Sequence, residues 1–148
     1  MDKEYLSLIE NQKYQITTLA QSASFFYHNL PNINWAGFYL YQDGKLVLGP
    51  YCGKIACEVI TLDKGVCGKA ATERKTIRVE NVHNFAGHIA CDSASNSEIV
   101  VPIICDNTLF GVLDIDSNIL NNFTIQNQKD LESCVRLLEN KLIQYKKN

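Results

Sequence analysis

The chain has 148 residues, 46% of them hydrophobic, and a formal net charge of −2. This length fits a single domain whose core needs no covalent cross-links. The near-neutral charge argues against a basic nucleic-acid-binding surface and against an acidic tail, and no apolar run approaches the roughly 20 residues that span a bilayer.

The first element in chain order is an amphipathic helix. From about residue 4 to residue 29, apolar side chains recur every three or four positions, and Pro31 follows the last of them. A hairpin is expected next, because Asp43-Gly44 between two apolar runs is a strong turn signal. The other elements expected in this half are strands at residues 35–41, 45–48, 57–62 and 76–79, and a short helix at residues 65–73.

A long polar segment without periodicity, residues 80–97, opens the second half. Loops of this length in compact domains are usually functional or disordered. A second hairpin follows over residues 98–104 and 109–115, and Thr124 is expected to cap a final helix over residues 124–146.

These elements predict an α+β fold in one domain over residues 1–148. About six antiparallel strands occupy residues 35–117 and are flanked by the N- and C-terminal helices. The two helices would either pack together on the sheet or lend apolar surface to a second subunit in a homodimer. The charged N-terminal residues predict no signal peptide, so we expect a cytoplasmic protein with no membrane or nucleic-acid partner.

Cys91 lies in the most informative stretch, a small, polar, turn-forming segment that ends where the chain turns apolar after Glu98. A cysteine in such a loop is accessible to solvent and substrate, and its thiolate would be the nucleophile. His83 and His88 lie upstream as candidate cationic partners of the sulfur. The competing interpretation is that the cysteine is merely a small hydrophobic residue.

The other cysteines differ in their surroundings. Cys57 and Cys67 lie among glycine, alanine and polar residues, whereas Cys105 and Cys134 lie in apolar or helical segments that fit a packing role. Cys52 fits either role. In the reducing cytosol any disulfide would be transient and catalytic. No Cys-x-x-Cys pair is present, so a structural zinc site is not expected.

Three acidic residues are predicted to converge near the long loop. Asp114 and Asp116 are two apart on a strand, so their side chains share one face, and Glu98 lies at the mouth of the preceding strand. Such carboxylates repel unless a cation, a metal or a shared proton relieves them. The cluster therefore favours an ammonium ligand or a general acid. A divalent metal and a merely solvated strand end are the rival interpretations.

Trp35 and Tyr39 are four residues apart on one predicted strand and therefore share a face. Most such pairs are core aromatics. Because the only tryptophan of the chain follows a polar loop, we expect the pair to form a pocket wall that attracts cationic or partly positive sulfur centres.

Several segments together resemble the GAF-domain free methionine-(R)-sulfoxide reductases. The similarity runs from about Trp35 to Ser117 with consistent spacing. The segments that carry it are Asn34-Trp35-Ala36-Gly37-Phe38-Tyr39, Leu48-Gly49-Pro50-Tyr51, Gly53-Lys54-Ile55-Ala56-Cys57, Gly65-Val66-Cys67-Gly68, the stretch from Val82-His83 to Ser97-Glu98-Ile99-Val100-Val101-Pro102, which contains His88-Ile89-Ala90-Cys91-Asp92, and Gly111-Val112-Leu113-Asp114-Ile115-Asp116-Ser117. One departure is Ala86, where many members carry proline.

The resemblance implies a role for each candidate residue. Cys91 would be the nucleophile, Cys57 the resolving cysteine and Cys67 an auxiliary thiol. The carboxylates that hold the substrate ammonium and the sulfoxide oxygen would be Glu98, Asp114 and Asp116, and the aromatic wall would be Trp35 and Tyr39.

The activity implied by the resemblance is reduction of free methionine (R)-sulfoxide to methionine. It would proceed through a cysteine sulfenic acid and an intramolecular disulfide, with thioredoxin as the reductant and with no metal or cofactor. Two alternatives stay open. GAF domains are often non-catalytic sensors of small ligands, and the acidic residues could instead form a metal-binding regulatory module.

Overall fold

The computed structural model describes residues 1–87 and 95–147. Within these residues, six antiparallel strands form one sheet in the order β3-β2-β1-β6-β5-β4. The strands are β1 (Ile33–Gln42), β2 (Lys45–Gly53), β3 (Val59–Thr61), β4 (Ile77–Val79), β5 (Ser97–Cys105) and β6 (Thr108–Ser117). The helices are α1 (Asp2–Ile9), α2 (Gln15–Asn29), α3 (Gly65–Glu73), α4 (Ile125–Lys147) and the short 3₁₀ helix η1 (Val82–Asn84). The predicted α+β fold with a six-stranded antiparallel sheet is confirmed.

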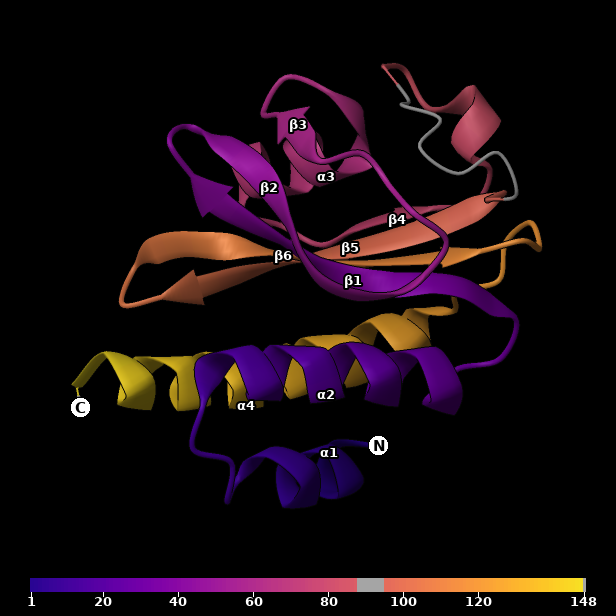
Figure 1. Ribbon diagram of the computed structural model, residues 1–148. Helices are drawn as coiled ribbons and strands as arrows, with labels where there is room; N and C mark the ends of the chain where they lie inside the picture. The colour runs from indigo at the N-terminus through magenta and orange to yellow at the C-terminus, as the bar shows by residue number, and fades with distance from the viewer. Residues whose placement is uncertain (88–94, 148) are drawn as a thin grey trace.

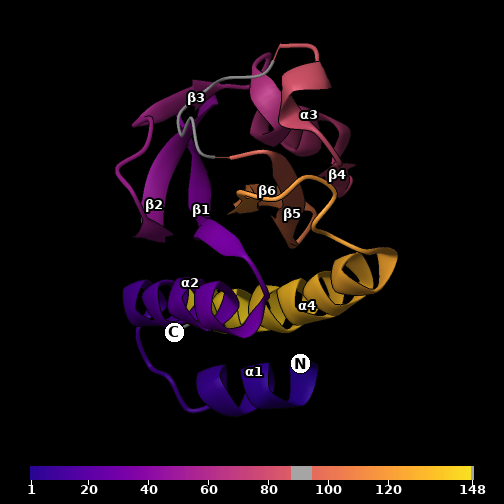
Figure 2. The same ribbon diagram turned by 90° about the vertical axis from the view of Figure 1, so that its right-hand side faces the viewer.

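The elements stack in layers (Figure 1). Helices α2 and α4 lie side by side against one face of the curled sheet, and α1 lies beyond them as an outer layer. Figure 2 shows α3 on the opposite side of the sheet from α2 and α4. The sheet is therefore covered unequally, with a long helical layer on one face and a single short helix on the other.

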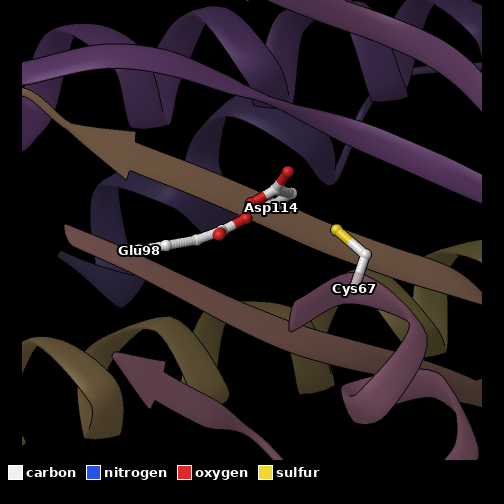
Figure 3. Close-up of side chains that lie close together, drawn as sticks. All are labelled: Cys67, Glu98 and Asp114. Atoms are coloured by element: carbon white, nitrogen blue, oxygen red, sulfur yellow. The ribbon is translucent and has the colours of Figure 1, made fainter. Parts of the chain in front are cut away.

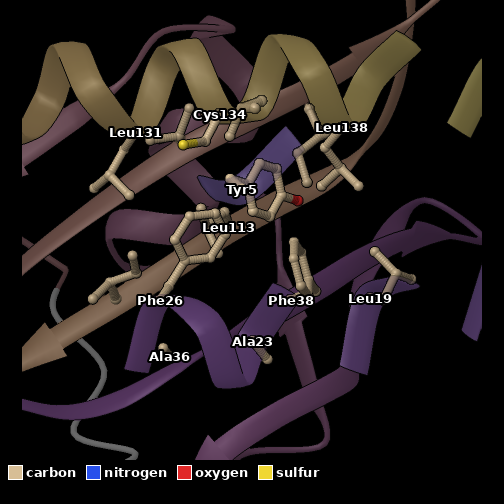
Figure 4. Packing of buried hydrophobic residues seen from close by; sticks show 14 of the residues in the cluster. Tyr5, Leu19, Ala23, Phe26, Ala36, Phe38, Leu113, Leu131, Cys134 and Leu138 are labelled. Carbon is tan, nitrogen blue, oxygen red and sulfur yellow. The ribbon is translucent and has the colours of Figure 1, made fainter. Parts of the chain in front are cut away.

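Two separate cores follow from the alternation of side chains along the strands. The first core lies between the sheet and the helices α1, α2 and α4 and contains Phe38, Leu113 and Ile115 (Figure 4). The second core lies under α3 and contains Val100, Val112 and both predicted wall aromatics. Because successive residues of a strand face opposite sides, Leu113 and Ile115 leave Asp114 and Asp116 on the α3 side, as predicted.

The N-terminal helix differs from the prediction, because residues 4–29 form two helices rather than one. α1 ends at Ile9 and α2 begins at Gln15. The polar run between them, residues 10–13, interrupts the apolar face and lets α1 fold back. Two side chains of α4 stabilise the segment between α1 and α2. Lys141 Nζ donates a hydrogen bond to the Glu10 carbonyl oxygen at 2.9 Å, and Tyr145 OH donates one to the Gln12 carbonyl oxygen at 3.1 Å.

Other local predictions agree with the structure. Asp43 and Gly44 have φ values of 53° and 77°, the left-handed pair that a tight hairpin between twisted strands requires. Thr124 Oγ1 accepts from Asn127 N at 3.0 Å and caps α4, as expected. The third strand is shorter than predicted, covering Val59–Thr61. No helix in residues 1–87 and 95–147 has both the length and the apolarity to cross a membrane.

Candidate active site

The candidate residues gather on the α3 face of the sheet, in rows set by strand register. Trp35 pairs with Asp116, and Asp116 pairs in turn with Glu98, so these three side chains form one row across β1, β6 and β5. In the next row Gly37 pairs with Asp114. The predicted convergence of the three carboxylates is a direct product of this register, although residues 98 and 116 are far apart in sequence.

Cys67 joins the carboxylates from the opposite side, because α3 lies over this part of the sheet (Figure 3). One ligand atom each of Cys67, Glu98 and Asp114 lies within 4.8 Å of the other two. Cys67 is 3% exposed, Glu98 8% and Asp114 6%, so water barely reaches the group. Asp116 is buried in the adjoining row. Figure 3 shows the Cys67 sulfur and the Glu98 carboxyl on either side of Asp114.

Burial of the acidic side chains, together with the repulsion between their negative charges, determines which of them are protonated. Burial raises the pKa of Glu98 well above its ordinary value, and the negative charges of Asp114 and Asp116 raise it further. Burial also raises the pKa of Asp114, while hydrogen bonds from Glu98 and Cys67 oppose that rise. We therefore assign a proton to Glu98, which donates it toward Asp114. Burial and the nearby carboxylates raise the pKa of Cys67 as well, so it carries a thiol.

The same three residues are the candidate ligands for a metal ion. Among the described residues, Cys67, Glu98 and Asp114 form a group that could share an ion, with one sulfur and two carboxylate oxygens as donors. No histidine of residues 1–87 and 95–147 belongs to it. An ion would have to displace the protons on Cys67 and Glu98, because only the deprotonated groups are ligands. Protons and a metal are thus competing ways to relieve the same repulsion.

Trp35 and Tyr39 are both buried in the second core, where they belong to a larger group of stacked rings, and their role as a pocket wall stays a prediction. We call Trp35, Tyr39 and Tyr51 the aromatic wall. The Trp35 indole is stacked with two tyrosine rings, Tyr51 at 5.2 Å between ring centroids and Tyr39 at 6.0 Å. It lies against two backbone positions that have no side chain: a Cβ on Gly37 would come 2.9 Å from Trp35 Cη2, and one on Gly53 would come 2.6 Å from Trp35 Cδ1. The participation of Tyr51 was not predicted, because it depends on β2 pairing with β1.

The wall also holds the segment that carries Cys57. Trp35 Nε1 donates to the Lys54 carbonyl oxygen at 3.1 Å, and Tyr39 OH donates to the Cys57 carbonyl oxygen at 2.9 Å. Burial raises the pKa of Tyr39, and the nearby carboxylates add to the rise, so its hydroxyl stays protonated as this hydrogen bond requires. Cys57 is therefore fixed relative to the aromatic wall.

The cysteines fall into distinct classes. Cys57 is disulfide-bonded, whereas Cys52, Cys67, Cys105 and Cys134 carry free thiols. Burial raises the pKa of Cys105 to about 11 and that of Cys134 to about 12, which fits their predicted packing role. Cys52 packs against the first core, on the sheet face opposite the carboxylates. The predicted nucleophile, Cys91, lies outside the described residues.

The described residues on either side of positions 88–94 are tied to the site. Gly65 N, at the start of α3, donates to Gly87 O at 3.0 Å. Asn34 Nδ2, beside Trp35 in β1, donates to Ser95 Oγ at 3.2 Å. The chain thus enters this segment next to the helix of Cys67 and leaves it next to the strand of the aromatic wall.

Of the two histidines upstream of Cys91, the structure describes the position of His83 only. His83 lies in η1, and its Nε2 is 2.9 Å from Asn96 Oδ1, so it links this short helix to the residue just before β5. Its proposed role as a cationic partner of the Cys91 sulfur stays a prediction. His88, the second candidate, lies outside the described residues.

Comparison with known proteins places this arrangement in context. The GAF domain family matches residues 17–139. The free methionine-R-sulfoxide reductase of Escherichia coli (strain K12) is 46% identical over 139 residues, which cover 94% of this chain and 84% of that protein.

Solved structures of such reductases are also similar to this chain. The fRMsr of Staphylococcus aureus in complex with substrate is 45% identical with a TM-score of 0.90, and the match covers 95% of this chain and 92% of that one. The free methionine-R-sulfoxide reductase from Neisseria meningitidis, also in complex with its substrate, is 33% identical with a TM-score of 0.94, covering 98% and 87%.

Proposed function

The chain belongs to the GAF-domain family of free methionine-R-sulfoxide reductases, and from this membership we propose that it reduces free methionine (R)-sulfoxide to methionine. One observation carries the proposal for this chain in particular. Three carboxyl groups, those of Glu98, Asp114 and Asp116, are buried together beside the stacked Trp35 ring. A buried acidic group of this kind needs a cation or a proton, and the proposed reaction uses both.

The cation is the α-ammonium group of the free amino acid. Asp114 and Asp116 hold it in the proposed complex, and the substrate's sulfur end lies against the Trp35 wall. A methionine within a peptide has an amide in place of the ammonium group, so it brings no charge to the carboxylates. The proposal therefore explains selection of the free amino acid, and Asp114→Asn or Asp116→Asn is expected mainly to weaken substrate binding.

The proton comes from Glu98. The Cys91 thiolate attacks the sulfur of the sulfoxide while the sulfoxide oxygen takes up one proton from Glu98. The S–O bond breaks with transfer of the oxygen to the cysteine, which releases methionine and leaves Cys91 as sulfenic acid. Methionine sulfoxide is reduced by two electrons, and the Cys91 sulfur is oxidised by two.

The resolving step regenerates the thiols. The Cys57 thiol attacks the Cys91 sulfenic acid, forms a disulfide and expels water. Thioredoxin then reduces this disulfide by exchange in the reducing cytoplasm, becoming oxidised itself. Cys67 has the auxiliary role in this scheme. Its thiol donates to Asp114 and helps to hold the carboxylates in place, which supports a positioning rather than a nucleophilic function.

The experiment that tests the proposal is a product assay on the purified chain. The protein is incubated with dithiothreitol and either diastereomer of free methionine sulfoxide, and the methionine formed is measured by chromatography. We expect turnover of the R form and essentially none of the S form, whose oxygen would point away from Glu98. No methionine from either form, with the R form still bound, would support the alternative of a non-catalytic ligand sensor.

Metal analysis of the same preparation tests the remaining alternative. The proposed cycle needs no resident metal. A divalent ion bound in equimolar amount and lost in Cys67→Ala would instead favour a metal-binding regulatory module at this site.

A further inference from the structure

Exposed apolar side chains flank Cys57 at equal distances along the chain. Ile55, two residues before it, is 87% exposed, and Val59, two residues after it, is 41% exposed. Single exposed apolar residues are ordinary on protein surfaces. Ile55 differs because it lies beside a disulfide-bonded cysteine and because its segment is held in place.

Two buried rings fix the backbone on both sides of Ile55. Trp35 Nε1 donates to the carbonyl oxygen of Lys54, and Tyr39 OH donates to that of Cys57. The segment between β2 and β3 is thus anchored one residue before Ile55 and two residues after it. The Ile55 side chain is consequently presented to solvent by a fixed backbone, and little ordering entropy remains to be lost when a partner covers it.

The proposed reaction requires an external dithiol reductant, and a protein reductant would need an apolar contact surface next to Cys57. Each turnover leaves a disulfide that involves Cys57, and an external dithiol must bring a thiolate up to one of its sulfurs. A small dithiol needs only access to the sulfur. A protein dithiol must also hold its surface against this site during two successive exchange steps, and apolar contact next to the reacting sulfur provides that. The exposed Lys54 and Glu58 supply a polar rim around the apolar residues.

We propose that Ile55, with Val59, forms the docking surface on which a protein dithiol reductant reaches the sulfur of Cys57. This inference rests on the proposed function. The reductant's thiolate attacks Cys57 Sγ, which forms a mixed disulfide and releases Cys91 as the thiolate. The second thiol of the reductant then attacks the mixed disulfide and frees Cys57. In total the reductant loses two electrons and two protons, and the enzyme gains them as two thiols.

The test compares two reductants on the full chain. Turnover of free methionine (R)-sulfoxide is measured once with dithiothreitol and once with a bacterial thioredoxin, its reductase and NADPH. The test variant is Ile55→Ser, and the matched control is Ile16→Ser, which removes an apolar side chain 65% exposed on α2, on the other side of the sheet. Ile55→Ser is expected to raise the KM for thioredoxin roughly tenfold and to leave the dithiothreitol rate unchanged. Ile16→Ser is expected to change neither.

The outcomes separate this inference from the proposed function. If the parent protein forms no methionine with dithiothreitol, the proposed function fails. If the parent is active and Ile55→Ser has the parent's KM for thioredoxin, the docking surface is refuted. Loss of the dithiothreitol rate in Ile55→Ser would also refute it, because Ile55 would then serve the site itself. A thioredoxin variant with a single active-site cysteine should be trapped on Cys57, and trapping on Cys91 would contradict the proposed point of attack.

Discussion

Replacing Glu98 with glutamine removes the proposed proton donor while keeping the size of the side chain. General acid catalysis by a positioned side chain typically contributes about 10²- to 10⁴-fold to a rate. Because we assign a proton to Glu98 in the resting protein, the neutral amide leaves the charge of the group unchanged. We therefore expect Glu98→Gln to slow methionine formation in a single turnover by about 10²-fold or more, with little change in substrate affinity.

Glu98→Gln should slow the reaction, but it should stabilise the folded protein at neutral pH. A carboxyl group whose pKa is higher in the folded than in the unfolded protein makes the folded state less stable as pH rises above its unfolded pKa, because only the unfolded chain ionises freely. If Glu98 were ionised in the folded protein, its carboxylate would lie within 4.8 Å of that of Asp114, and the two would repel by about 3 kcal/mol at an effective dielectric constant near 20, so Glu98 keeps its proton there. Glutamine escapes this penalty. Glu98→Gln should thus be more stable than the parent at neutral pH, by roughly 1–3 kcal/mol.

Urea unfolding at a series of pH values from 4 to 8 measures this difference. The gap in the free energy of unfolding should be small near pH 4, where the unfolded carboxyl is protonated, and should grow as pH rises, up to the folded pKa. Glu73→Gln, at the exposed end of α3, is the matched control and should show no such gap. A variant that is less stable than the parent at neutral pH, or a gap that does not change with pH, would refute the assignment of the proton to Glu98.

Four further predictions concern the rest of the site. Cys91→Ser should abolish turnover, because a hydroxyl with an ordinary pKa does not attack sulfur at neutral pH, and measurable steady-state turnover would exclude Cys91 as the nucleophile. Cys57→Ser should release about one methionine per site in a rapid-quench experiment and then stall; non-reducing peptide mapping of the parent should show Cys57 linked to Cys91. N-acetylation of the substrate should eliminate binding in calorimetry, since it removes the charge that the carboxylates would hold. Gly37→Ala should destabilise the protein by about 1–3 kcal/mol in urea and weaken substrate binding, because its Cβ would overlap Tyr51 and displace the Trp35 ring.

Local sequence signals were sufficient for much of this fold. The alternation of Leu113, Asp114, Ile115 and Asp116 gave the correct face for each side chain, because the period of a strand leaves no other choice once one face is buried. The Asp43-Gly44 turn was equally reliable, since few residues adopt a positive φ without strain. The expected proximity of Glu98 to the aspartates required only that adjacent strands pair as a hairpin.

What could not be predicted depends on contacts between distant segments. The break before α2 is stabilised by Lys141 and Tyr145, which no pattern within residues 4–29 reveals. Tyr51 joins the aromatic wall through the pairing of β2 with β1. Cys67 reaches the carboxylates only because α3 docks on the sheet, and neither the spacing of the cysteines nor their neighbours in sequence gives that distance.

The unequal covering of the sheet explains how one small domain tolerates three buried carboxyl groups. The first core, between the sheet and three helices, is almost entirely apolar and supplies the stability. On the other face, α3 brings the neutral Cys67 thiol close to Glu98 and Asp114, and this group supplies no positive charge that could relieve the repulsion between the carboxyl groups. In the proposed complex the substrate ammonium supplies the missing positive charge. Because Asp114 and Asp116 are kept in Glu98→Gln, this substitution should stabilise the protein and slow the proposed chemistry while it leaves the proposed binding of the substrate ammonium group nearly unchanged.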